Sequence, residues 1–522
     1  MSFSRVLSAQ TNYLDAAIIK VETDLSKGLN SFSIVGLPDK AVEEARDRIS
    51  AAIKNSGFLS PKQKNQRTVV ALAPAELKKE GANFDLAIAL GYLLATKLIR
   101  FNPEKRLFLG ELSLDGKLQP IAGSLALVSE AKKRGIEEVY LPKQNATEGA
   151  LISDIKIFGA DNLLEIIAHL IEKSLDKTDE SPRILKFELE VTPPTQVIYE
   201  EPERGLDLSD IKGQESAKRG LLISAAGGHN LAMYGPPGTG KTMLARAFTH
   251  LLPSLSFEEA LEVTAIHSVS GTLKETLVTR PPLRSPHHTS SYVAIVGGGT
   301  VPKPGEITLA HRGVLFLDEF PEFERRVIDG LRQPLEDRVV SVSRIKGTAQ
   351  FPAQFILIAA MNPCPCGNFG ISGKPCICSA SNIERYKRKI SGPIIDRIDL
   401  WVEVSSVDHE SLTSREKSGA DTKTVRKQIA EAREIQAKRF KDSKRPIKTN
   451  GEMSAKDVIE LIDLAKEVKD EFNKSAKKLD LSARSYHRVL KLARTIADLE
   501  KSDAVEREHI FEALQYRPKQ RM

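Results

Sequence analysis

The sequence predicts an α/β protein with three parts: an N-terminal α+β domain, a central domain around a parallel β-sheet, and a C-terminal helical domain. Between residues 210 and 405, short apolar segments alternate with helical segments, which is typical of a parallel sheet covered by helices. Residues 426–518 show helical periodicity only, whereas residues 1–174 mix strand and helix patterns.

Composition is consistent with a globular chain of about three domains. The chain has 522 residues, 41% of them hydrophobic and 28% charged, and a net charge of +7. Its longest apolar stretch, residues 84–95, contains Asp85 and is shorter than the ~20 residues of a membrane helix. The N-terminus lacks the basic start and apolar run of a signal peptide. We therefore expect a cytoplasmic protein with no membrane partner.

Two polar stretches divide the chain. Residues 175–209 are charged, contain several prolines and show no sustained periodicity, and residues 406–425 form a second polar break. These stretches predict an N-terminal domain over 1–174, a linker over 175–209, a central domain over 210–405 and a helical domain over 406–522.

A phosphate-binding loop is the strongest motif. It follows the apolar segment LAMY, precedes the helical segment MLARAFTHLL and fits G-x-x-x-x-G-K-[ST] in the context that this motif requires. Backbone N–H groups of such a loop face phosphate oxygens, the lysine reaches the β- and γ-phosphates, and the last hydroxyl binds Mg²⁺. The predicted ATP-binding residues are Gly235, Pro236, Pro237, Gly238, Thr239, Gly240, Lys241 and Thr242.

Two further apolar segments end in polar residues that complete a hydrolytic site. GVLFLDE ends in Asp318 and Glu319; Asp318 is expected to bind Mg²⁺, and Glu319 to orient and deprotonate the attacking water. QFILIAAMN ends in Asn362, whose amide suits a hydrogen bond to that water or to the γ-phosphate. The alternative for Asn362 is a cap of the next turn.

Several long motifs resemble a known family. DIKGQ, PHHTSS, LRQPLED, MNPCPCG and SGPIIDRIDL occur in the order found in the magnesium-chelatase-like AAA+ ATPases, and the match is best to the YifB and competence ComM branch. The resemblance implies an AAA+ core with a helical lid, and a hexameric ring. It also implies that Arg397 is an arginine finger, Arg484 a second sensor arginine on the lid, and Ile211 part of the adenine pocket.

All four cysteines lie in a loop at 362–380. Cys364 and Cys366 form one C-x-C pair, and Cys376 and Cys378 form another. Four thiolates favour a structural zinc site, although Cys₄ sites usually have longer spacers. Reduced cysteines without a metal, and redox or iron–sulfur chemistry, remain alternatives.

Residues 76–131 resemble the proteolytic domain of Lon-type proteases. That chemistry needs a serine nucleophile beside a lysine base. Asn83 stands at the serine position and Leu125 at the lysine position, while Ser124 is one register shift away. We expect a non-proteolytic scaffold or binding module.

Two segments are candidates for contact with DNA. Residues 339–354 predict a β-hairpin with Arg344 and Lys346 near its tip, where basic side chains suit phosphate contacts. The insert 264–305 carries Arg284 and the pair His287–His288, and resemblance to hexameric helicases implies that it projects toward a central pore.

Two functions compete on this evidence. One is an ATP-driven ring motor that translocates on single-stranded or branched DNA or drives branch migration, as in natural transformation and recombination. The other is a chelatase-type motor that remodels a metal-inserting protein partner. The Lon-like domain and the cysteine loop favour the first, because chelatase motor subunits lack that N-terminal extension.

Overall fold

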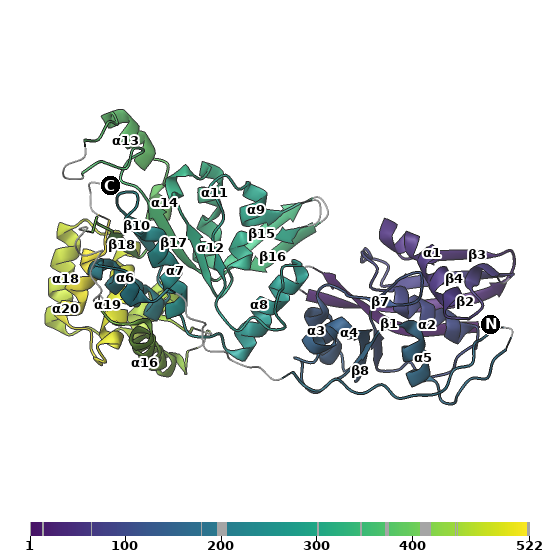
Figure 1. Cartoon of the computed structure of the whole chain (residues 1–522). Coiled ribbons are helices and arrows are strands. Elements are labelled where there is room, and N and C mark those ends of the chain that lie inside the picture. The colour runs from purple at the N-terminus through teal and green to yellow at the C-terminus, as the bar shows by residue number, and fades with distance from the viewer. Residues whose placement is uncertain are drawn as a thin grey trace. The chain divides into compact units, whose positions relative to one another are not determined.

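The computed structural model divides the chain into two compact units. Unit 1 comprises residues 1–198 together with Thr264–Leu277, and unit 2 comprises the remaining residues (Figure 1). The residues that the structure describes are 2–12, 15–63, 65–178, 180–195, 206–299, 302–344, 347–370, 375–407, 419–443, 445 and 447–518.

Unit 1 contains a seven-stranded mixed sheet in the order β3-β4-β2-β1-β5-β8-β9. The long strands β1 and β2 form an antiparallel pair, β4 continues antiparallel to β2, and the β1–β5, β5–β8, β8–β9 and β3–β4 pairs are parallel. The strands are β1 (Ser2–Asn12), β2 (Asp15–Lys27), β3 (Ser31–Val35), β4 (Gln66–Ala73), β5 (Arg106–Phe108), β8 (Glu138–Pro142) and β9 (Lys156–Ala160), with a small separate pair β6 (Glu111–Leu112) and β7 (Leu118–Gln119).

Five helices and part of the predicted linker 175–209 complete the described part of this unit. Helix α2 is apolar apart from Asp85 at its start and is nearly all buried, as expected of a helix inside a core. Part of the predicted linker also belongs here, because Phe187 N–H donates to Ala168 and Thr192 N–H to Ile157. Residues 196–205 of that linker lie outside the described residues. The helices are α1 (Lys40–Asn55), α2 (Asp85–Ala95), α3 (Ser124–Lys133), α4 (Lys143–Gly149) and α5 (Leu163–Leu170).

Unit 2 is built on a five-stranded parallel sheet in the order β11-β14-β17-β10-β18. Its inner strands are continuous apolar runs such as VLFL, because helices on both faces bury both sides of such a sheet. The strands are β10 (Leu231–Tyr234), β11 (Leu283–Arg284), β14 (Val314–Leu317), β17 (Ile356–Met361) and β18 (Leu400–Glu403).

Helices around this sheet and the C-terminal helices share one apolar core, which runs from Leu208 to Tyr516. Helix α8 begins in unit 2, and its residues from Thr264 onward cluster with unit 1. The main helices are α6 (Glu215–Gly227), α7 (Lys241–Leu251), α8 (Phe257–Val269), α9 (Tyr292–Val296), α10 (Glu306–Leu309), α11 (Arg325–Gly330), α12 (Arg332–Asp337), α13 (Ala380–Lys387) and α14 (Gly392–Ile395), followed by α16 (Thr422–Phe440), α17 (Ala455–Leu461), α18 (Lys466–Lys478), α19 (Ala483–Leu499) and α20 (Arg507–Gln515).

The expected fold class is confirmed: a mixed α+β region, a parallel-sheet core and a C-terminal helical region are all present. Strands β15 (Val339–Arg344) and β16 (Gly347–Pro352) pair antiparallel, which confirms the predicted hairpin. Among the described residues, no helix is both long enough and apolar enough to cross a membrane.

Candidate nucleotide-binding and hydrolytic site

The predicted site residues follow three neighbouring strands. Lys241 starts α7 after β10, Asp318 and Glu319 follow β14, and Asn362 follows β17. These strands are adjacent in the order β14-β17-β10, and parallel strands end at the same edge of a sheet. Ligands bind in the crevice at that edge in open α/β sheets.

The loop between β10 and α7 has the backbone shape that a phosphate site needs. Gly238 and Gly240 adopt φ values of 78° and 90°, in the left-handed region that side chains disfavour. Gly240 is the residue that precedes the first turn of α7, so the free N–H groups of that helix point out of the loop toward an anion.

Lys241 lies inside the loop. Its Nζ donates to the carbonyl oxygens of Gly235 (2.8 Å) and Pro236 (2.7 Å) and to Oδ1 of Asn362 (3.2 Å). Burial lowers its pKa from the usual value. Lys241 thus contacts Asn362, the predicted site residue that lies 121 positions later in the chain.

Thr242 and Asp318 present two oxygen atoms side by side. Thr242 Oγ1 donates to Asp318 Oδ2 over 2.8 Å. Adjacent ligands of an octahedral Mg²⁺ ion lie about 3 Å apart, given metal–oxygen distances of about 2.1 Å. The two side chains therefore fit the magnesium ligands that the sequence predicts.

Glu319 turns away from the strand axis. Its φ is 51°, and its N–H donates to Asp318 Oδ1 over 2.9 Å. Its side chain is 54% exposed, and Oε2 lies 3.0 Å from Nδ1 of His288. The carboxylate is therefore partly open to solvent, as expected of a water-activating group, and it contacts His288 of the insert.

The residue predicted to contact adenine, Ile211, lies in the core, and a cavity lies beside the phosphate loop. Ile211 is buried in the apolar core of unit 2, so its adenine contact stays a prediction. A cavity of about 740 Å³ opens beside the start of the loop. Aromatic residues dominate part of its wall, namely Tyr234, Phe369, Tyr386 and Trp401.

The two predicted arginines meet at one carboxylate. Arg397 forms an ion pair with Glu336 of α12 and donates to Pro393 O (2.8 Å), and Arg484 lies 3.4 Å from the same Glu336. The Arg397 side chain is 10% exposed and that of Arg484 is 60% exposed. Within the described part of the chain, neither arginine has a hydrogen bond or ion pair to the phosphate loop.

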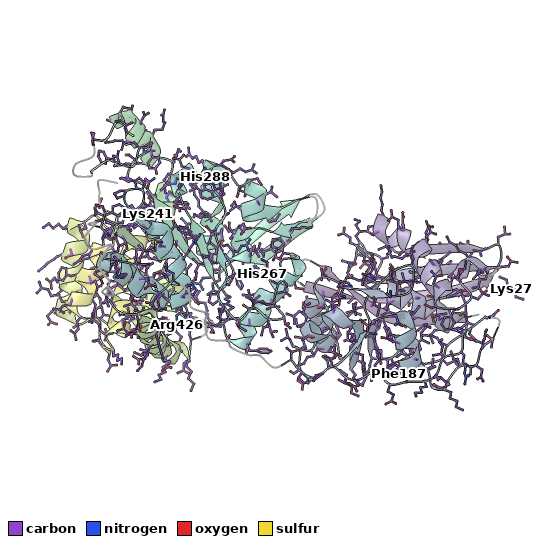
Figure 2. The ribbon with its side chains drawn as sticks, viewed as in Figure 1. Lys27, Phe187, Lys241, His267, His288 and Arg426 are labelled. Carbon is purple, nitrogen blue, oxygen red and sulfur yellow. The ribbon has the colours of Figure 1, made fainter. Side chains whose placement is uncertain are left out.

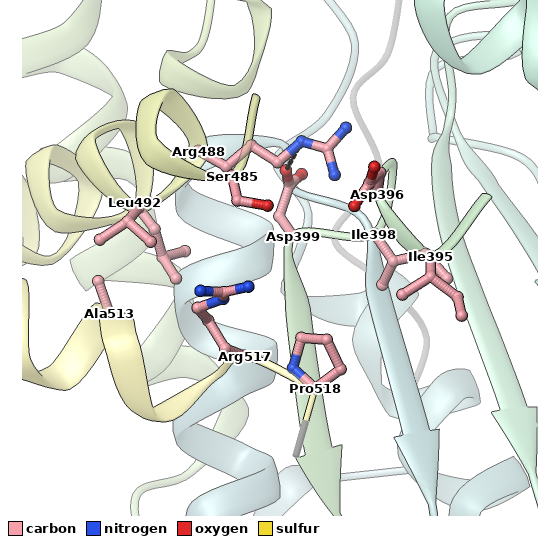
Figure 3. A pocket seen from close by; sticks show the side chains of 11 residues that line it. Ile395, Asp396, Ile398, Asp399, Ser485, Arg488, Leu492, Ala513, Arg517 and Pro518 are labelled. Atoms are coloured by element: carbon pink, nitrogen blue, oxygen red, sulfur yellow. Dashed lines mark ion pairs between the residues drawn. The ribbon is translucent and has the colours of Figure 1, made fainter. Parts of the chain in front are cut away.

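A small polar cavity ties the segment around Arg397 to the helical region. Asp396 and Asp399 lie on one side of it, and Ser485, Arg488 and Arg517 lie on the other (Figure 3). Arg488 Nε is 3.5 Å from Asp399. Burial opposes ionisation of Asp399, but the nearby His229 (Nδ1–Oδ2 3.6 Å) and the charge of Arg488 prevail and lower its pKa to about 2. The two segments are therefore joined by charge.

The four cysteines gather into one cluster. All four sulfur atoms lie within 4.8 Å of one another, with Sγ–Sγ distances of 3.4 Å (364–366), 3.7 Å (364–376) and 3.6 Å (366–376). A tetrahedral zinc site with Zn–S bonds of about 2.3 Å has sulfur atoms about 3.8 Å apart. The geometry fits a zinc ion in spite of the short spacers.

The structure describes two of the three basic residues predicted to contact DNA. Arg344 ends strand β15 beside the hairpin turn, whereas Lys346 lies outside the described residues. Arg284 forms a two-pronged ion pair with Glu306 (2.6 and 2.7 Å). Its charge is thus neutralised within the chain, which makes Arg284 the weaker candidate.

In unit 1 the positions matched to the Lon dyad are packed into the fold. Ser124 and Leu125 are buried at the start of α3. Leu125 N–H donates to Glu148, which also accepts from Ser268, in the stretch Thr264–Leu277 that clusters with this unit. Asn83 uses its backbone carbonyl to accept from Gly110.

Sequence reasoning missed two residues of this region. Glu336, which receives both arginines, stands in LRQPLED, and His288, which contacts Glu319, stands in PHHTSS. Both motifs belong to those that carry the family resemblance, so the resemblance could have pointed to Glu336 and His288. The contacts themselves depend on packing between distant segments.

Together the sheet, the phosphate loop and the acidic pair define a P-loop nucleotide-binding core of the AAA+ type. Residues 207–412 match the family described as "Magnesium chelatase, subunit ChlI", residues 21–145 match "Subunit ChlI of Mg-chelatase", and residues 419–517 match its C-terminal domain.

Whole-chain relatives narrow the family. The chain is 42% identical to "Competence protein ComM" of Haemophilus influenzae (99% of this chain, 98% of the relative) and 41% identical to "Uncharacterized protein YifB" of Escherichia coli (99% and 97%). It is also 30% identical to "Lon protease 2" of Bacillus subtilis over 27% of each chain. The chain belongs to the magnesium-chelatase-like ComM and YifB family of AAA+ proteins. This membership indicates an ATPase that uses ATP and Mg²⁺.

Proposed function

We propose that the protein is a ring-shaped motor that hydrolyses ATP to move on DNA. The observation that carries the hydrolytic part is the meeting of Lys241, Thr242, Asp318 and Asn362 at one edge of the sheet through hydrogen bonds of 2.8–3.2 Å. The full-length similarity to a competence protein supports DNA as the substrate.

Each residue of the edge has one task in this proposal. The loop N–H groups and Lys241 bind the phosphates, and Thr242 and Asp318 hold Mg²⁺, which neutralises phosphate charge when bound. Glu319 accepts a proton from the attacking water. Asn362, next to Lys241, orients the γ-phosphate or that water.

The ring follows from the arginines. Arg397 and Arg484 converge on Glu336 rather than on the phosphate loop of their own chain. We infer that both reach the nucleotide of a neighbouring copy, where their guanidinium groups neutralise charge on the transferring phosphoryl group. A closed ring, of six copies by resemblance, gives every site a neighbour.

The hairpin of β15 and β16 is the proposed DNA contact. Val340, Val342 and Phe351 of the hairpin are buried, which anchors its strands. We expect the basic residues Arg344 and Lys346 to contact phosphates. Gln333 of α12 bonds to Ser341 of β15 (3.1 Å), and α12 also carries Glu336. The hairpin and the two arginines thus both contact helix α12. Through this helix, a change of the bound nucleotide can move the hairpin against DNA.

A chelatase-type motor that remodels a metal-inserting protein is the second candidate. The family description over residues 207–412 favours it. The full-length match to a competence protein favours the DNA motor.

We also propose that the cysteine cluster binds one zinc ion with a structural role. Four thiolates leave no open position on the metal. Gly367, inside the cluster loop, packs so closely on Pro237 that an added Cβ would lie 2.6 Å from its ring. The loop therefore braces the phosphate loop.

The N-terminal domain is proposed to be a non-proteolytic scaffold.

The test is the ATPase rate of the whole chain without DNA and with single-stranded, duplex and branched DNA of random sequence. We expect Mg²⁺-dependent hydrolysis that at least one of these DNAs stimulates. Hydrolysis that no DNA changes would favour the chelatase-type alternative, and absence of hydrolysis under all conditions would contradict both.

A further inference from the structure

Asn230 lies at the amino end of β10, opposite the edge of the sheet that carries the hydrolytic residues. It directly precedes Leu231, the first residue of β10, while Lys241, which Figure 2 labels, comes after the carboxyl end of the same strand. A strand of four residues spans about 13 Å. Asn230 therefore lies outside the hydrolytic site, although its side chain is partly buried.

The side-chain amide of Asn230 joins two segments that flank β10. Its Nδ2 donates to the backbone carbonyl oxygen of Arg397 over 3.0 Å, and its Oδ1 accepts from the backbone N–H of Leu357 over 2.9 Å. Leu357 belongs to β17, which leads to Asn362, and β10 lies between β17 and β18 in the sheet. Asparagine suits this place because one short side chain offers both a donor and an acceptor. The amide therefore links the backbone of the proposed finger to the strand that leads to Asn362.

The backbone of Asn230 adds three hydrogen bonds to the segment that follows the finger. Its carbonyl oxygen accepts from the N–H groups of Asp399 (2.9 Å) and Leu400 (3.0 Å), and its N–H donates to Oδ2 of Asp399 (3.1 Å). On its other side, Asp399 lies 3.5 Å from Arg488 in the small polar cavity (Figure 3). The three backbone bonds do not depend on the side chain of Asn230. A substitution there therefore removes the amide contacts and leaves these bonds in place.

The backbone of Arg397 is held more completely than its side chain. Its N–H donates to Ile394 O over 2.8 Å, and its carbonyl oxygen accepts from Asn230. The guanidinium pairs with Glu336 and donates to Pro393 O, but its Nε is buried and, among the described residues, has no hydrogen-bond partner. A buried donor without a partner costs free energy. This combination of a fixed backbone and an incompletely bonded side chain suits an arginine that reaches a group outside its own copy.

We propose that Asn230 is a positioning residue that fixes the backbone of Arg397 against β10 and β17. The finger offered to a neighbouring copy is thereby set by the two strands that lead to this copy's own phosphate loop and to Asn362. A shift of either strand on nucleotide binding moves Arg397 with it, so that one copy's nucleotide adjusts the next copy's hydrolysis. This inference rests on the proposed function, in which Arg397 acts in the neighbour's site.

The test measures ATP hydrolysis and equilibrium ATP binding by the full-length variants. Asn230→Ala is expected to lower kcat roughly tenfold to a hundredfold, the cost of misplacing a catalytic group by about 1 Å, and to keep the ATP affinity of the parent. Asn230→Asp keeps the shape and the acceptor oxygen for Leu357 but cannot donate to Arg397, so it is expected to lose as much. Asn382→Ala removes an exposed asparagine that contacts Arg385 and, as the control, should match the parent.

Mixtures with Lys241→Ala separate a displaced finger from a damaged strand. In them the intact phosphate loop of an Asn230→Ala copy can meet the well-placed finger of a Lys241→Ala copy, so the rate per Asn230→Ala copy is expected to rise. Arg397→Ala is mixed in the same way for comparison.

The outcomes distinguish this inference from the proposed function. Rescue of Arg397→Ala without rescue of Asn230→Ala overturns the positioning role and leaves the ring in place. A parent-like kcat or a lower ATP affinity in either Asn230 variant overturns that role as well. Absence of rescue for both Arg397→Ala and Asn230→Ala contradicts the finger acting between copies, and the positioning role is contradicted with it.

Discussion

The phosphate loop edge and the arginine pair at Glu336 are two differently organised regions of unit 2. At the edge, Lys241 donates to Asn362 and Thr242 donates to Asp318, both within the chain. At the other, Arg397 and Arg484 share a carboxylate of α12 and have no hydrogen bond or ion pair to the phosphate loop in the described part of the chain. The first region is complete in one copy. The second holds two arginines whose charge suits a phosphate, and we propose that a neighbouring copy supplies that phosphate.

The difference teaches how the two regions respond to substitution. A change at the edge disables only the copy that carries it. In the proposed ring, a change at the arginines is expected to disable the neighbour's site, so mixtures of variants separate the two regions.

Arg397→Ala is expected to reduce kcat by roughly 10³–10⁵, because a finger that neutralises phosphoryl charge contributes that much. Mixed with Lys241→Ala, it is expected to regain activity, since some mixed interfaces pair an intact loop with an intact finger. Steady-state hydrolysis at several mixing ratios measures this. Arg388→Ala, which removes an exposed arginine paired with Glu384, is the control and should match the parent. Absence of rescue, with subunit exchange demonstrated, would place Arg397 in its own chain's site.

Glu319→Gln is expected to lower kcat by roughly 10²–10⁴, the usual contribution of a general base, and to keep ATP affinity. Hydrolysis and equilibrium nucleotide binding are measured together. Glu322→Gln is the matched control, because Glu322 is exposed and pairs with Lys389. In mixtures with Arg397→Ala copies, the nucleotide site of each Glu319→Gln copy should stay inactive, because no neighbour can supply the missing base. Undiminished turnover would remove Glu319 from the role of base.

Replacing Arg344 and Lys346 together with Ala is expected to weaken DNA binding and to reduce its salt slope by roughly 0.7–0.9 for each lost phosphate contact. Basal hydrolysis should persist, because neither residue belongs to the nucleotide edge. Binding is measured as a function of salt concentration, with the exposed Gln350→Ala on the same hairpin as control. Parent-like unwinding of branched DNA by the double variant would shift attention to the insert that carries Arg284.

The smallest effect on rate is expected at the cysteines, for which we propose a structural role. Elemental analysis of protein purified without added metal should give about one zinc ion per chain, and Cys376→Ser should lose it. Because Gly367 packs on Pro237, metal loss should weaken nucleotide binding more than it changes kcat. A metal-free sample that is folded and binds ATP like the parent would refute the zinc site.

The sequence by itself determined much of unit 2. Alternation of apolar strands with helices implies a parallel sheet, and parallel strands end at one edge, so Lys241, Asp318 and Asn362 were predictable as neighbours from their positions after strands. The hairpin at 339–354 was equally readable, because β-rich runs on both sides of a short turn pair locally. The family motifs supplied Arg397, Arg484 and Ile211, which residue types alone do not single out.

Tertiary structure alone decided which distant side chains meet. The strand order β14-β17-β10 puts Asn362 beside Lys241. Glu336 of α12 meets Arg397, which follows α14, and Arg484 of α19. The loop after β11 sets His288 against Glu319. Four cysteines with unusual spacing converge within 4.8 Å. Local patterns encode which face of an element is buried, whereas these contacts depend on how elements far apart in the chain pack together, which no local pattern specifies.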